Sequence, residues 1–79
     1  MSRILKTPQH EKLRLFLIEK RQKAGLRQAD VAKRLGRPQS YITNVETGQK
    51  IFSVVELLEW ANAIGLDPKE ALRRLRDTG

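Results

Sequence analysis

Apolar residues recur every three or four positions along most of the chain, which is the spacing of one face of a helix. Leu13, Phe16 and Leu17 show this spacing within residues 9–23. No alternating run of β-branched residues indicates a strand. Glycines fall at the ends of the periodic segments, where helices stop. The pattern predicts an all-α domain of five short helices, over residues 9–23, 27–35, 38–47, 53–64 and 68–76.

The last two predicted helices carry start signals. Ser53 and Glu56 have the spacing of a capping box, and Asp67 with Glu70 repeats it around Pro68. The inward faces of these helices, with the segment between them, are predicted to be Val54, Leu57, Leu58, Ala61, Ile64, Leu66, Leu72 and Leu75. Trp60 lies beside this face and is interpreted as a core residue rather than as part of a self-association surface.

A chain of 79 residues predicts one domain, here residues 9–77 after a flexible arm of residues 1–8. The absence of cysteine excludes disulfides and thiolate metal sites. His10 is the only histidine, and the sequence contains neither a phosphate-binding glycine loop nor a nucleophile–base pair. We therefore expect no metal, no cofactor and no enzymatic activity. With no signal peptide or membrane span, a soluble cytoplasmic protein is expected.

Basic residues are concentrated in the first part of the chain. The net charge is +7, but residues 1–50 hold twelve Lys and Arg against four acids, whereas residues 51–79 are nearly neutral. This asymmetry indicates one face that meets a polyanion and another that packs or pairs. A solvated basic surface explains the charge equally well, so charge alone does not decide the function.

The most informative segment is the predicted third helix. On a helical wheel that starts at Gln39, the small polar residues Ser40, Thr43, Asn44 and Thr47 fall between roughly 40° and 140°. Tyr41, Ile42 and Val45 lie on the opposite side. Amides and hydroxyls match the hydrogen-bonding groups of base edges, and Gln or Asn can form two bonds to adenine. The alternative is an ordinary polar helix on the surface of a small domain.

Residues 26–67 resemble the Cro/phage-repressor family of helix-turn-helix domains, the XRE-like class. The similarity extends back to Leu17 and Arg21 and has no gap within the two-helix segment. The matching positions are Gly25-Leu26, Gln28, Val31-Ala32, Leu35-Gly36, Gln39-Ser40, Ile42, Glu46, Gly48, Ser53, Leu57, Ala61, Ile64-Gly65 and Asp67-Pro68. The resemblance implies a five-helix repressor-like fold with its helix-turn-helix at helices 2 and 3.

The resemblance also implies residue roles. The base-reading positions match Gln39, Ser40, Thr43 and Asn44. The phosphate-contacting positions match Gln28, at the start of helix 2, and Gln49 and Lys50, after helix 3. Arg21 and Glu46 match a structural ion pair between helix 1 and the end of helix 3.

Two positions depart from the family pattern. Arg27 stands where an N-capping Ser or Thr is usual, and Arg37-Pro38 replaces an aliphatic residue before helix 3. Both changes add positive charge beside the motif, so we expect further phosphate contacts from Arg27 or Arg37.

These observations predict a transcriptional regulator that reads double-stranded DNA in the major groove through helix 3, as a homodimer on a near-palindromic site in the nucleoid. The alternative is a protein-binding module, such as an antitoxin-like component that also binds DNA. An enzyme is rejected.

Overall fold

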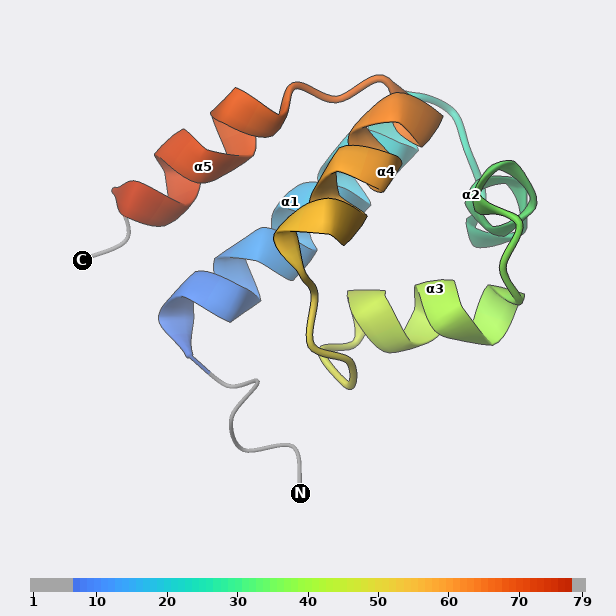
Figure 1. The fold of residues 1–79 in the computed structure, drawn as a ribbon, viewed down its shortest axis with the longest axis horizontal. Coiled ribbons are helices and arrows are strands. Elements are labelled where there is room, and N and C mark those ends of the chain that lie inside the picture. Colours follow the sequence, from blue (N-terminus) through green and yellow to red (C-terminus); the bar gives the residue numbers. More distant parts are fainter. Residues whose placement is uncertain (1–6, 78–79) are drawn as a thin grey trace.

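The computed structural model describes residues 7–77, and within them all regular secondary structure is helical (Figure 1). Predicted and observed bounds differ by no more than one residue. The five helices are α1 (Pro8–Lys23), α2 (Gln28–Leu35), α3 (Gln39–Glu46), α4 (Val54–Ile64) and α5 (Pro68–Arg76).

Helix α1 begins one residue earlier than predicted. The Thr7 hydroxyl accepts a hydrogen bond from the His10 backbone N–H at 3.1 Å, and Pro8 occupies the first helical turn. Proline suits this place because its missing N–H would have no partner there. The last two residues of the predicted arm therefore start the helix, and residues 1–6 lie outside the described residues.

The helix-turn-helix lies at one end of the molecule and α5 at the other, with α1 and α4 between them (Figure 1). Helix α2 packs on α3 and α4, while α1 contacts both α3 and α5. Gly36 joins α2 to α3 with a φ of 67°, a left-handed conformation that glycine adopts without steric cost. The Arg37 N–H then donates to the Ala32 carbonyl at 3.0 Å, which closes α2 with a tight turn.

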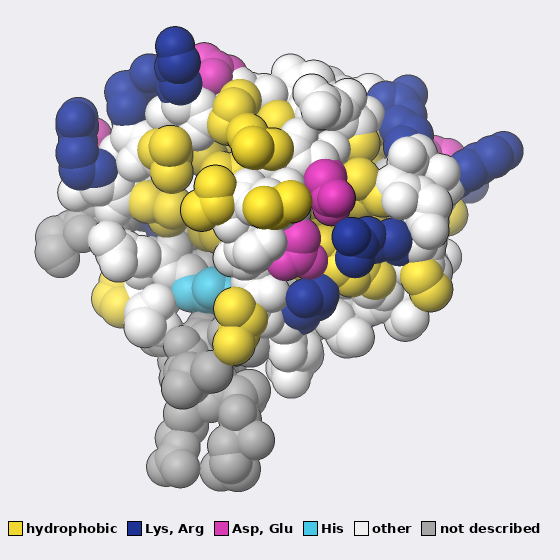
Figure 2. Space-filling view, viewed as in Figure 1, with side chains coloured by type: hydrophobic (Ala, Val, Ile, Leu, Met, Phe, Trp, Pro, Cys, Tyr) yellow, Lys and Arg dark blue, Asp and Glu magenta, His cyan; other side chains and the backbone are white. Residues whose placement is uncertain are grey.

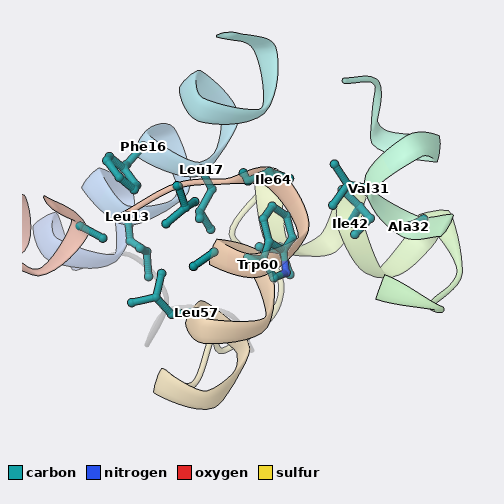
Figure 3. Packing of buried hydrophobic residues seen from close by; sticks show 13 residues of the cluster. Leu13, Phe16, Leu17, Val31, Ala32, Ile42, Leu57, Trp60 and Ile64 are labelled. Carbon is teal, nitrogen blue, oxygen red and sulfur yellow. The ribbon is translucent and has the colours of Figure 1, made fainter. Parts of the chain in front are cut away.

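Trp60 is a core residue, as the sequence predicted, but it lies at the centre of the core rather than beside it. Its side chain is fully buried, and it lies between Leu17 on one side and Val31 and Ile42 on the other (Figure 3). The indole N–H donates to the Tyr41 hydroxyl at 3.4 Å, so its polar atom is also satisfied. One side chain thus connects α1 and α4 to the helix-turn-helix.

Three residues predicted to be buried are instead exposed. Val54, Leu58 and Leu72 keep 68%, 50% and 52% of their surface accessible. The buried side of α4 is formed by Leu57, Trp60, Ala61 and Ile64. Because Trp60 belongs to this side, the buried side is rotated relative to the prediction, and Val54 and Leu58 face solvent. Leu66 is buried and Leu75 packs against the core, but α5 faces its neighbours through Ala71, which leaves Leu72 outside.

The two predicted capping boxes differ. Ser53 accepts from the Glu56 N–H at 3.1 Å, and the Glu56 carboxylate accepts from the Ser53 N–H at 2.9 Å, which completes the first box. Asp67 caps α5 by accepting from the Lys69 N–H. Its expected partner Glu70 pairs instead with Lys20 of α1, against which α5 packs, and with Arg74 one turn further along α5.

Candidate nucleic-acid interface

The polar side of α3 faces solvent. Gln39, Ser40, Asn44 and Thr47 are exposed, whereas Ile42 and Val45 are buried on the opposite side. Within residues 7–77, the side chains of Gln39, Ser40 and Asn44 have no hydrogen-bonding partner. Their amides and hydroxyl are therefore free to meet a ligand.

Thr43 lies at the edge of this surface and turns toward α2. Its hydroxyl donates to the Gln28 Oε1 at 2.9 Å, and the Gln28 Nε2 donates to the Glu46 Oε1 at 2.8 Å. Thr43 keeps its methyl group and an oxygen lone pair for an outside partner, and Gln28 keeps one amide hydrogen. Both residues are partly buried and join α2 to α3.

Arg21, in the last turn of α1, and Glu46, the last residue of α3, form the ion pair that the family resemblance implied. The Arg21 Nε and Nη2 atoms lie 2.6 and 3.1 Å from the two Glu46 carboxylate oxygens. The Arg21 Nη1 donates to the Leu26 carbonyl at 2.8 Å. With Gln28 and Thr43, this pair connects α1, α2 and α3 through continuous hydrogen bonds.

Arg14 is a second cation at the end of α3, and sequence reasoning missed it. Its Nη1 donates to the Glu46 backbone carbonyl at 3.0 Å, and its Nε donates to Glu11 on the same helix at 3.0 Å. The hydrogen bonds that Arg14 donates to Glu11 raise the pKa of Arg14. The spacing of Glu11 and Arg14 was visible in the sequence, but the contact with α3 needs the packing of two distant helices.

Arg27 occupies the N-cap position of α2 without capping through its side chain. The Asp30 carboxylate reaches back and accepts from the Arg27 N–H at 2.8 Å and from its Nε at 3.3 Å. These side-chain and backbone hydrogen bonds from Arg27 lower the pKa of Asp30. A guanidinium cannot accept a hydrogen bond, so Asp30 alone replaces the missing Ser or Thr cap.

Arg37 lies between α2 and α3 and contacts α4. Its Nη2 donates to the Glu59 Oε1 at 3.2 Å, and its guanidinium carbon lies 4.6 Å from the centre of the Tyr41 ring. Pro38 occupies the N-cap position, so α3 starts at Gln39 despite the departure from the family pattern. The roles of Tyr41 and Glu59 were not identified from the sequence.

Lys50 follows α3, next to the exposed Gln49. Its Nζ lies 3.3 Å from the Glu56 Oε2 and 5.7 Å from the centre of the Tyr41 ring. The Tyr41 hydroxyl donates to the same Glu56 oxygen at 2.7 Å. Burial opposes the charge of Glu56, but hydrogen bonds from Tyr41, Ser53 and Lys50 prevail and lower its pKa to about 2. Burial and the bond to Glu56 raise the pKa of Tyr41 to about 12.

Residues 7–77 contain neither a cluster of metal ligands nor a membrane-spanning helix. No group of three or more His, Cys, Asp or Glu side chains could hold a metal ion there. None of the helices in this range has the length and apolar character needed to cross a membrane.

Comparison with known proteins agrees with this geometry. A family model for the helix-turn-helix domain matches residues 12–75. A solved structure of an XRE-family like protein from Pseudomonas syringae pv. tomato str. DC3000 is 35% identical, covers 86% of this chain and 83% of its own, and superposes with a TM-score of 0.81. No curated protein matches the chain. The chain belongs to the helix-turn-helix domain family and is an XRE-like DNA-binding regulator.

Proposed function

We propose that the protein binds a specific double-stranded DNA sequence by placing α3 in the major groove. The observation that supports this is the set of exposed side chains on α3 that have no partner within residues 7–77, Gln39, Ser40 and Asn44. Amides and hydroxyls at these exposed positions match the hydrogen-bonding groups on the edges of bases. The α1–α2–α3 hydrogen bonds hold the backbone of this helix in place, which favours a fixed reading geometry.

The proposed contacts divide into two groups. Base edges are read by Gln39, Ser40 and Asn44, with Thr43 offering its methyl group and lone pair. Phosphates are contacted by side chains around α3, which set the register without reading sequence. The proposed phosphate contacts are Arg27, Gln28, Arg37, Gln49 and Lys50.

Selection of binding sites from random duplexes, followed by Asn44→Ala, tests this proposal. We expect a recovered consensus, and for Asn44→Ala a loss of about 1–3 kcal/mol on that site with relaxed preference at one base pair. Lys50→Ala should instead weaken all sequences alike and reduce the salt slope by up to about one unit. Failure to bind any duplex at low salt, or unchanged base preference in both Gln39→Ala and Asn44→Ala, would refute it.

We further propose that two copies bind together on a near-palindromic site with half-sites about 34–36 Å apart. Four apolar side chains around the start of α4 are exposed, and Figure 2 shows hydrophobic side chains gathered on this face. They belong to the nearly neutral part of the chain, where like charges do not oppose pairing. These residues are Ile51, Val54, Val55 and Leu58.

Sedimentation at micromolar concentration, with and without the selected duplex, tests the pairing. Leu58→Glu should convert a dimer to a monomer, whereas Leu15→Glu is a matched control because Leu15 on α1 is similarly exposed, 52% against 50%. A monomer under both conditions rules out the dimer.

The same apolar face suits a different protein in an antitoxin-like module, and a stoichiometric co-purifying protein lost in Leu58→Glu would favour that second function. We propose a cytoplasmic location for either function, and only the DNA-binding regulator requires association with the nucleoid.

A further inference from the structure

Carboxylates of α4 hold two basic side chains that flank α3 in the sequence, one before the helix and one after it. Arg37 precedes α3 and pairs with Glu59 at 3.2 Å. Lys50 follows α3 and pairs with Glu56 at 3.3 Å. Glu56 and Glu59 are three residues apart, so they lie on the same side of α4. Figure 2 shows acidic and basic side chains next to each other beside the hydrophobic face.

Tyr41 connects the two ion pairs. Arg37 and Lys50 both lie within cation–π distance of its ring, and its hydroxyl donates to Glu56. Each cation therefore already has an acidic partner and an aromatic partner inside the protein. A phosphate that binds either cation must replace or share these partners.

We propose that Glu59 and Glu56 are positioning residues that hold Arg37 and Lys50 beside α3 and limit the affinity of the protein for the DNA backbone. This inference rests on the proposed function. A carboxylate that neutralises a cation reduces the number of counterions released when that cation meets phosphate. Backbone contacts are made on every sequence, so the limit applies to all duplexes, and occupancy of unrelated DNA stays low at a given protein concentration.

Glu59 is the better residue for the test, because Glu56 also caps α4. Glu59→Gln keeps the size of the side chain and removes its charge. Glu19→Gln is the matched control: Glu19 also pairs with an arginine of another helix, Arg74, at 3.2 Å, and its loss changes the net charge equally. That pair joins α1 to α5, outside the helix-turn-helix.

Fluorescence anisotropy with an unrelated duplex and with the selected site, over about 50–200 mM salt, gives both affinity and salt slope. Glu59→Gln should bind both duplexes about three to ten times more tightly, with a slope steeper by up to about one unit. Glu19→Gln should change affinity less than about twofold and leave the slope unchanged. Equal effects of the two variants, or no effect of Glu59→Gln, would overturn the proposal.

The decisive experiment introduces Glu59→Gln into a variant that already carries Arg37→Gln. If Glu59 acts by holding Arg37, then adding Glu59→Gln to Arg37→Gln should change neither affinity nor slope. A gain that persists in this background shows direct repulsion of DNA by Glu59 and overturns the positioning role. If the wild-type protein binds no duplex, the proposed function fails and this inference fails with it. If the wild type binds but Glu59→Gln is indistinguishable from it, this inference alone fails.

Discussion

Two arginine–glutamate pairs flank α3, and they differ in burial. Arg21 and Glu46 expose 12% and 4% of their side chains, whereas Arg37 and Glu59 expose 37% and 43%. Glu46 accepts from Arg21 through both carboxylate oxygens and from Gln28 as well. Glu59 receives one bond from Arg37. The same two residue types thus form a closed buried cluster between α1, α2 and α3 and an open, half-exposed pair between the α2–α3 turn and α4.

Burial decides what each pair can do. A buried charge that loses its partner cannot recruit water, so the inner pair holds three helices in one arrangement. A half-exposed pair is screened by solvent and contributes little to stability, so its arginine can change partners at small cost. The inner pair therefore serves the fold and the outer pair is available for binding.

The largest effect should come from Glu46→Gln. The variant leaves the Arg21 guanidinium buried without a counter-ion, and we expect a loss of about 3–5 kcal/mol in the free energy of unfolding. Urea titration followed by the fluorescence of Trp60 measures it, and failure to fold at 25 °C agrees with the expectation. A loss below about 1 kcal/mol would show that the inner pair is no different from a surface pair.

The second largest effect on the free energy of unfolding should come from protonation of Glu56 at acid pH. Its pKa falls from 4.5 to about 2 in the folded protein, so its stabilising effect is complete above the unfolded value and is lost as the pH falls from about 5 to 2. We expect on the order of 2 kcal/mol from this group. Unfolding of wild type and Glu56→Gln at pH 7 and pH 3 measures it. Equal acid sensitivity of the two proteins would contradict the prediction.

Gln28→Ala tests whether the inner cluster extends beyond its ion pair. The variant removes a donor to Glu46 and the acceptor for the Thr43 hydroxyl, and we expect a loss of about 1–2 kcal/mol in the free energy of unfolding. Gln22→Ala is the control, because Gln22 is an exposed glutamine of α1. Chemical denaturation of both variants should separate them, and equal midpoints would restrict the cluster to Arg21 and Glu46.

Glu59→Gln should have the smallest effect on stability. The free energy of unfolding should change by no more than about 0.5 kcal/mol, because a half-exposed pair gains little over its solvated groups. The same urea titration applies, with Glu46→Gln as the opposite case. A loss above about 1 kcal/mol would remove the distinction between the two pairs and assign Glu59 to the fold.

Local signals were enough to predict the helices. Ser53 and Asp67 mark two helix starts by hydrogen bonds within three residues, and Gly36 ends α2 by its own backbone conformation. The polar side of α3 follows from helical spacing within eight residues. The pairing of Arg21 with Glu46 came from the family resemblance and not from any local pattern.

Contacts between distant segments could not be predicted from the sequence. Val54 and Leu58 are as apolar as Leu57, and only the position of Trp60 against α1 and the helix-turn-helix leaves them outside. Glu70 has the spacing of a cap, but cations on two helices attract it more strongly. Spacing along one helix shows which residues share a side and says little about the neighbour that covers it.

Residue order alone is therefore sufficient for the number of helices, their ends and the side of α3 that is polar, because these depend on interactions within one or two turns. The partners of the charged groups depend on how the helices pack. Packing buried Glu46 among α1, α2 and α3 and left Glu59 half-exposed beside the turn between α2 and α3, and so separated a structural ion pair from an accessible one. The physical reason is that the strength of a charge interaction depends on its surroundings, and those are created by residues far away in the chain.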